Sequence, residues 1–218
     1  MSIRDERKQQ SRQALLDAAL RLSTSGRSFS SISLREIARE VGLVPTAFYR
    51  HFQDMDELGR ELVDQVALHL KNILHQLGQR YLSHPNTSTK TSIDLFFASV
   101  DQNSEPWIFM IAERWGGAEV VRQAISREIE YLNEDLVNDL EKLESVQHFQ
   151  DQSDLKVLSN ILINLSLTWA MSWISLLRQP PSIELELEKM VLKNQTVTQV
   201  QLIFRGISNW ERPQTEAN

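Results

Sequence analysis

A cluster of side chains suited to binding a polyanion lies between residues 33 and 51. Arg50 can reach a guanine edge or a phosphate oxygen, and Tyr49 and His51 can donate hydrogen bonds to phosphates. Thr46 and Ala47 are short enough to let the backbone approach a nucleic acid closely. The chemistry expected of this segment is therefore recognition, with phosphate contacts for position and base contacts for sequence.

Local signals predict a helix at the start of this segment. Ser33 and Glu36 have the spacing of a capping box, and Gly42 is suited to the positive φ that ends a helix. Ser33 and Arg35 would then lie at the amino end of this helix, where the amide dipoles favour a phosphate. The helix is predicted to run from Ser33 to Gly42.

A second short helix is predicted from Pro45 to about Phe52. Proline costs nothing in a first turn, and Phe48 and Phe52 would face inward. Two helices joined by a turn with glycine form the helix-turn-helix plan, whose second helix enters the DNA major groove. On spacing alone, an ordinary helical hairpin explains residues 33–52 equally well. The residues predicted to contact DNA are Ser33, Arg35, Pro45, Thr46, Ala47, Tyr49, Arg50 and His51.

Charge is divided unevenly along the 218-residue chain, whose net charge is −6. Residues 1–53 contain nine basic and five acidic side chains, and the remainder contains 14 basic and 24 acidic ones. We therefore expect residues 1–53 to form a basic module that binds a polyanion, and the acidic remainder to have another task. The chain has no cysteine, which excludes disulfides and thiolate chemistry and suits a reducing cytoplasm.

Apolar spacings of three and four residues dominate, so the fold class expected is all-α. Residues 1–55 are predicted to form a three-helix DNA-binding head whose first helix, 5–25, ends at Gly26. Residues 56–218 are predicted to form a larger helical body for ligand binding and dimerisation. Its helices are expected at 56–83, 90–103, 105–115, 118–144, 153–178 and 182–210.

The string from Ser33 to Phe52 closely resembles the DNA-binding signature of the TetR family of bacterial repressors, and the likeness extends over about the first 60 residues. Residues 45–59 look most like FabR and DesT, repressors of unsaturated fatty-acid synthesis. A fainter likeness to them continues in Glu113-Arg114, Gly117 and residues 122–129. The resemblance implies a repressor that binds a palindromic operator and responds to a long-chain acyl-CoA or acyl-carrier thioester. A repressor of an efflux or catabolic operon that responds to another hydrophobic molecule is the alternative.

The signature departs from the family pattern at three positions. Many members have Ser where Val44 stands, Gly where Thr46 stands and Lys where Met55 stands. That Lys usually binds a phosphate, so one backbone contact is expected to be lost here. The fatty-acid subgroup shares an apolar residue at that place, so Met55 favours the subgroup.

A homodimer is expected for two reasons. By resemblance, the last two long helices pair with their copies in a second subunit to form a four-helix bundle. Residues 155–177 are apolar on more than one face, and Met190, Val197, Val200, Phe204 and Ile207 form a stripe suited to such packing.

Aromatic side chains in the body could line an apolar ligand pocket, although a place in the core is the better explanation for any single one of them. Arg114 and Arg122 are candidate partners for the phosphates of a thioester ligand, or for salt bridges with Glu113 or Glu119. The predicted ligand residues are Phe97, Trp107, Met110, Arg114, Trp169 and Trp173.

Other function classes lack their signatures. The five histidines show no zinc-binding spacing, and no phosphate loop or nucleophile motif occurs, so no enzyme activity, metal or cofactor is expected. Residues 155–177 include Lys156, Asn160 and Asn164, which disfavours a membrane span. A cytoplasmic protein without membrane contact is expected. A helical interaction module that does not bind DNA stays open.

Overall fold

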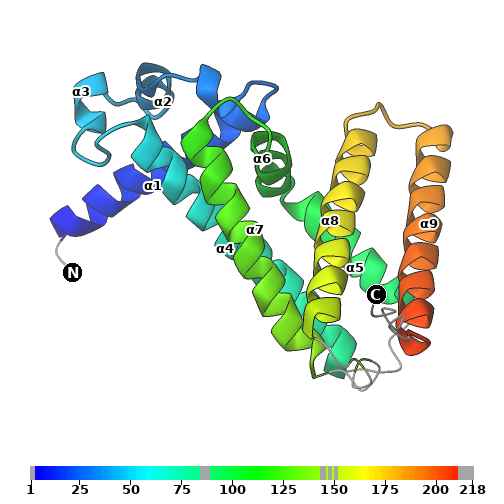
Figure 1. Ribbon diagram of the computed structural model, residues 1–218. Coiled ribbons are helices and arrows are strands. Elements are labelled where there is room, and N and C mark those ends of the chain that lie inside the picture. The colour runs from blue at the N-terminus through cyan, green and yellow to red at the C-terminus, as the bar shows by residue number, and fades with distance from the viewer. Residues whose placement is uncertain (1–2, 84–88, 143–145, 147–148, 150–151, 211–218) are drawn as a thin grey trace. The chain divides into compact units, whose positions relative to one another are not determined.

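The computed structural model describes residues 3–83, 89–142, 146, 149 and 152–210. In this part of the chain every regular element is a helix, as the sequence predicts (Figure 1). The elements are α1 (Ile3–Thr24), η1 (Phe29–Ser31), α2 (Leu34–Glu40), α3 (Pro45–Phe48), α4 (Met55–Ser83), α5 (Thr89–Gln102), α6 (Glu105–Glu113), α7 (Glu119–Leu140), α8 (Gln152–Leu177) and α9 (Ile183–Ser208).

Two compact units make up the chain. The first unit comprises Met1–Leu74 and Asn103–Tyr131, and the second comprises His75–Gln102 and Leu132–Asn218. This grouping by contacts does not coincide with a boundary at residue 55, because α6 and the first half of α7 belong with the head. The functional division into a DNA-binding head and a ligand-binding body stays a prediction.

Apolar side chains of α1 to α4, α6 and the first part of α7 form the core of the first unit. Leu15, Ala18 and Ala19 of α1 are completely buried, as the predicted stripe requires, and so is Ile37 of α2. Phe48 joins them, with its ring 5.6 Å from that of Phe52. Burial of each large side chain contributes about 1.5–3 kcal/mol, which holds the short helices in place without long helical runs of their own.

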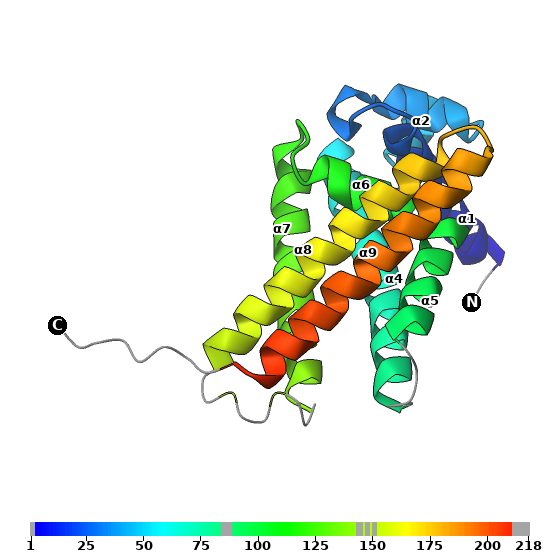
Figure 2. The same ribbon diagram turned by 90° about the vertical axis from the view of Figure 1, so that its right-hand side faces the viewer.

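Helices α5, α8 and α9 form the second unit together with the ends of α4 and α7. Helices α8 and α9 run side by side in both views (Figures 1 and 2). One apolar cluster joins Val137, Leu140, Leu155, Leu158 and Ile207. Ile207 and the adjoining Phe204 thus pack within their own unit, so the end of the stripe predicted for subunit packing is core instead.

Helix α8 is long and apolar enough to cross a membrane when judged by length and composition alone. Nearly half of its most apolar stretch is buried inside the protein. The core helix of a soluble protein passes the same test, so the property is weak evidence for a membrane span.

Candidate DNA-binding surface and effector residues

The start of α2 is built from local hydrogen bonds. The Glu36 amide donates to Ser33 Oγ at 3.3 Å, and Glu36 Oε2 accepts from the Ser33 amide at 2.9 Å. Both halves of the predicted capping box are therefore confirmed. The Arg27 guanidinium, with the Ser33 amide and hydroxyl, lowers the pKa of Glu36 to about 2. Because the Ser33 hydroxyl also donates to Glu36, a phosphate would have to replace that bond.

A tight turn joins α2 to α3. Gly42 has a φ of +70°, as predicted, and the Leu43 amide donates to the Ala38 carbonyl at 2.8 Å. Pro45 then occupies the first turn of α3. The turn brings α2 and α3 into contact with each other (Figure 1).

Helix α3 is shorter than predicted and ends at Phe48, not near Phe52. The amides of Arg50 and His51 donate to carbonyls three residues earlier, which tightens the chain into a turn. Phe52 is nonetheless buried, as its predicted inward position requires. The expected recognition helix is thus a single turn of α-helix, Pro45–Phe48, followed by the tighter turn at Arg50 and His51.

All eight residues predicted to contact DNA keep some exposure to solvent. Tyr49 is 59% exposed although the preceding Phe48 is fully buried. The exposed residues are Ser33, Arg35, Thr46, Tyr49 and Arg50, and the partly exposed ones are Pro45, Ala47 and His51. The fold therefore leaves this set accessible to a ligand, and the individual DNA contacts stay predictions.

His51 differs from its neighbours because its ring is partly enclosed. Its Nδ1 atom is buried and has no hydrogen-bond partner among the described residues. Burial, followed by the positive charges of Arg12, Lys8 and Arg50, lowers the pKa of His51. The fold therefore favours the neutral form of the ring, which can still donate a hydrogen bond to a phosphate.

Arg12 has a structural role that the sequence did not reveal. Its guanidinium donates to the His51 carbonyl and to both carboxylate oxygens of Glu61, with the Nε to Oε1 bond at 2.8 Å. It also lies over the ring of Phe52, 4.1 Å from the centroid, and 3.7 Å from Glu57. Arg12 therefore fastens the turn after α3 to α1 and α4.

Replacing Arg12 with Ala should lower the free energy of unfolding by about 2 kcal/mol, since charge-assisted hydrogen bonds are lost and Glu61 is left unpaired. Urea unfolding followed by circular dichroism measures the change. Arg60→Ala is the control, because Arg60 lies exposed on α4. Equal stability of the two variants would show that the Arg12 contacts add nothing.

The residues predicted to bind the effector are divided between the two units. In the second unit, Phe97 stacks on Trp173 with centroids 4.4 Å apart, and Trp169 donates to Gln199 Oε1 at 2.6 Å. In the first unit, Trp107 and Met110 are completely buried. Apart from the half-buried Arg114, these predicted side chains are packed as core.

One of the two candidate arginines, Arg122, makes a contact other than those predicted. Arg122 donates to the carbonyl of Gly116 at 2.6 Å and forms no ion pair among the described residues. The predicted salt bridge of Arg122 with Glu119 is therefore wrong; a backbone carbonyl takes the guanidinium instead. The Arg114 guanidinium lies over the ring of Trp115, 5.7 Å from its centroid.

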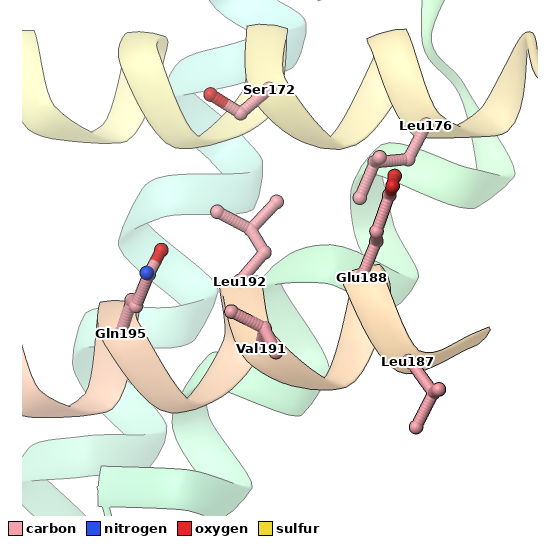
Figure 3. Close-up of a pocket in the computed structure, with 7 residues that line it drawn as sticks. All are labelled: Ser172, Leu176, Leu187, Glu188, Val191, Leu192 and Gln195. Atoms are coloured by element: carbon pink, nitrogen blue, oxygen red, sulfur yellow. The ribbon is translucent and has the colours of Figure 1, made fainter. Parts of the chain in front are cut away.

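An open apolar groove of about 330 Å³ lies between α8 and α9 (Figure 3). It is lined by Ser172, Leu176, Leu187, Glu188, Val191, Leu192 and Gln195. None of the six predicted effector residues lines it. Sequence reasoning missed these positions, although exposed apolar residues at helical spacing in α9 were a usable signal.

Comparison with known proteins places both parts of the chain in one family. Residues 15–62 match the model of bacterial regulatory proteins of the tetR family, and residues 85–204 match the tetracyclin repressor-like C-terminal domain. The structure resembles a transcriptional regulator from Aquifex aeolicus VF5, with a TM-score of 0.59 and 18% identity over 88% of this chain and 98% of that one. A transcriptional regulator from Rhodococcus sp. Rha1 has a TM-score of 0.63 and 14% identity over 92% and 100% of the two chains.

The fatty acid degradation regulator FadR from Bacillus halodurans shares the fold as well. Its TM-score is 0.59, with 11% identity over 92% of this chain and 96% of that one. Identities this low establish the fold alone, whereas the second family model alone covers more than half of the chain. The chain therefore belongs to the TetR family of transcription regulators, which are DNA-binding proteins and not enzymes.

Proposed function

We propose that this protein is a homodimeric, ligand-responsive repressor that binds a palindromic operator through residues 33–52. Its genes would be those of unsaturated fatty-acid synthesis, and its effector a long-chain acyl thioester. Such a regulator works in the cytoplasm. The two heads of a symmetric dimer suit a palindrome whose half-sites are separated by a multiple of about one DNA turn.

The observation that carries DNA binding is the distribution of unpaired cations in the first unit. Arg12, Arg21 and Arg27 are held by acidic partners within the fold. The other basic side chains among residues 4–53 are exposed and form no ion pair within the described part of the chain: Arg4, Arg7, Lys8, Arg35, Arg39 and Arg50. Unpaired surface cations beside an exposed α2 and α3 are what phosphate binding requires.

The acyl thioester rests on the resemblance of residues 45–59 to FabR and DesT. FadR from Bacillus halodurans, whose name refers to fatty acid degradation, adds only the shared fold. Because Phe97 stacks closely on Trp173, a long acyl chain would have to open this aromatic cluster. The effector acts only if it binds one of two arrangements more tightly, by about 1–3 kcal/mol for a typical regulator.

Binding of a labelled duplex from the promoter upstream of the protein's own gene tests the proposal by fluorescence anisotropy. We expect affinity to fall about a thousandfold between about 50 and 200 mM salt, because bound phosphates release counterions. Absence of binding at low salt would leave a helical interaction module as the better explanation.

A thermal-shift screen of acyl-CoA esters that differ in length and unsaturation, with and without the duplex, tests the effector. We expect long-chain esters to raise the unfolding temperature, since a ligand that binds the folded state stabilises it. The size of this increase should differ when the duplex is present. Stabilisation by other hydrophobic molecules but not by acyl-CoA would favour the efflux or catabolic alternative.

A further inference from the structure

Glu113, the last residue of α6, is a buried carboxylate that recognition of DNA or effector does not explain. Its side chain is 1% exposed, and it forms no ion pair with a cation among the described residues. Oε1 accepts a hydrogen bond from the Phe29 amide at 2.8 Å, and Ser28 Oγ donates to Oε2 at 3.4 Å. Burying a carboxylate is costly unless hydrogen bonds replace those it made to water. The shorter of the two bonds comes from the Phe29 amide, which is therefore the principal partner of Glu113.

The segment that Glu113 holds leads directly into the helix-turn-helix. Phe29 begins η1, which connects α1 to the capping residue Ser33 of α2. The Phe29 ring is buried and meets Phe109 of α6 edge-on, with centroids 6.4 Å apart. Helix α6 therefore holds this connection at two points of Phe29: Glu113 binds its backbone amide, and Phe109 packs against its ring. All of these residues belong to the first unit.

Two glycines after α6 allow the chain to close over this contact. A Cβ at Gly116 would lie less than 3.0 Å from Oε2 of Glu113, and one at Gly117 would lie 2.5 Å from Ser30 Oγ. Real Cβ atoms essentially never come that close. The Gly116 carbonyl is in turn held by Arg122 at 2.6 Å. A side chain at residue 116 would therefore displace the carboxylate.

We propose that Glu113 is a positioning residue for operator binding, because its carboxylate holds the Phe29 amide and thereby fixes the segment that leads into α2. A displacement of residues 113–117 would then alter how α2 and α3 meet DNA. This inference rests on the proposed operator binding. The end of α6 would thus keep α2 in place for DNA binding, without itself contacting DNA or effector.

Hydrogen exchange at the Phe29 amide, followed by nuclear magnetic resonance, tests the hydrogen bond without DNA. Glu113→Ala should speed exchange of the Phe29 amide at least about tenfold, since the buried amide loses its hydrogen-bond acceptor. Glu113→Gln keeps an oxygen that can accept from this amide and should stay near wild type, whereas Glu113→Asp withdraws the carboxylate by one methylene and should resemble Glu113→Ala. Glu130→Ala removes an exposed carboxylate from α7 and is the matched control.

Operator affinity, measured with the promoter duplex, should follow the same order. Glu113→Ala and Glu113→Asp should weaken binding about tenfold, and Glu113→Gln should restore it. Gly116→Ala should weaken binding in the wild type but have little further effect in Glu113→Ala, because it acts by displacing the carboxylate. A general loss of packing would instead make the two changes additive.

Three results would overturn the inference: unchanged exchange in Glu113→Ala, Glu113→Gln as weak as Glu113→Ala, or faster exchange with unchanged operator affinity. A wild-type protein that binds no operator would instead overturn the proposed function. The two failures are distinguishable, since exchange at Phe29 is measured in the absence of DNA.

Discussion

Thr46→Glu should abolish specific operator binding and leave the dimer and its stability unchanged. Thr46 is exposed in the first turn of α3, beside Ala47 and the exposed Tyr49 and Arg50. A carboxylate there would face phosphates, and repulsion of several kcal/mol in each of two heads should weaken binding at least about a hundredfold. Glutamate near a helix amino end is favourable for the helix itself, so folding gives no competing explanation.

The measurement pairs anisotropy of the promoter duplex with sedimentation and thermal unfolding. Thr91→Glu is the control, because Thr91 is also exposed in the first turn of a helix, α5. It adds the same charge outside the predicted surface and should bind as wild type does. Operator binding by Thr46→Glu at wild-type strength would remove α3 from the groove.

Local signals in the sequence were sufficient for the frame of this surface. The Ser33 capping box and the positive φ at Gly42 depend on residues within a few positions, and both are confirmed. The early end of α3 was not predictable in the same way. It depends on how Phe48 and Phe52 are buried together, and burial is set by packing against other helices.

Contacts between distant residues were beyond the reach of sequence patterns. Arg12 counted only as one positive charge of the head, yet it is engaged with Glu61, 49 positions later. Glu113 meets the Phe29 amide 84 positions away, and a backbone amide leaves no sequence signal. The excess of basic residues was therefore a sound indication of a polyanion partner, but the structure had to separate internal cations from available ones.

The second unit shows the same limit in its apolar residues. Periodicity predicts which residues of α9 share a face but not whether the neighbour on that face is its own chain or a copy. Ile207 is covered within the unit, whereas Leu187 and Val191 remain 52% and 49% exposed. Exposed apolar residues also occur along α8, at Val157, Ile161 and Met171. Exposed apolar residues on two adjacent helices are what a subunit interface would cover.

Replacing Leu187 and Val191 together with Glu should convert the predicted dimer to a monomer. The two positions are one helical turn apart in α9 and line the groove beside Glu188 (Figure 3). In a symmetric dimer each new carboxylate would be buried against a copy of the same apolar face, at a cost that no partner offsets. Both positions are half-exposed within one chain and glutamate is a good helix former, so each subunit should still fold.

Sedimentation velocity at micromolar concentration gives the oligomeric state, and operator affinity should fall on the order of a hundredfold or more because two linked heads no longer bind together. Leu68→Glu is the control: Leu68 is 59% exposed on α4, so it undergoes the same substitution outside α8 and α9. A double variant that remains dimeric would move the interface to another surface. A wild-type monomer that binds the operator tightly would show that six unpaired cations in one head suffice, and the dimer would then be unnecessary for affinity.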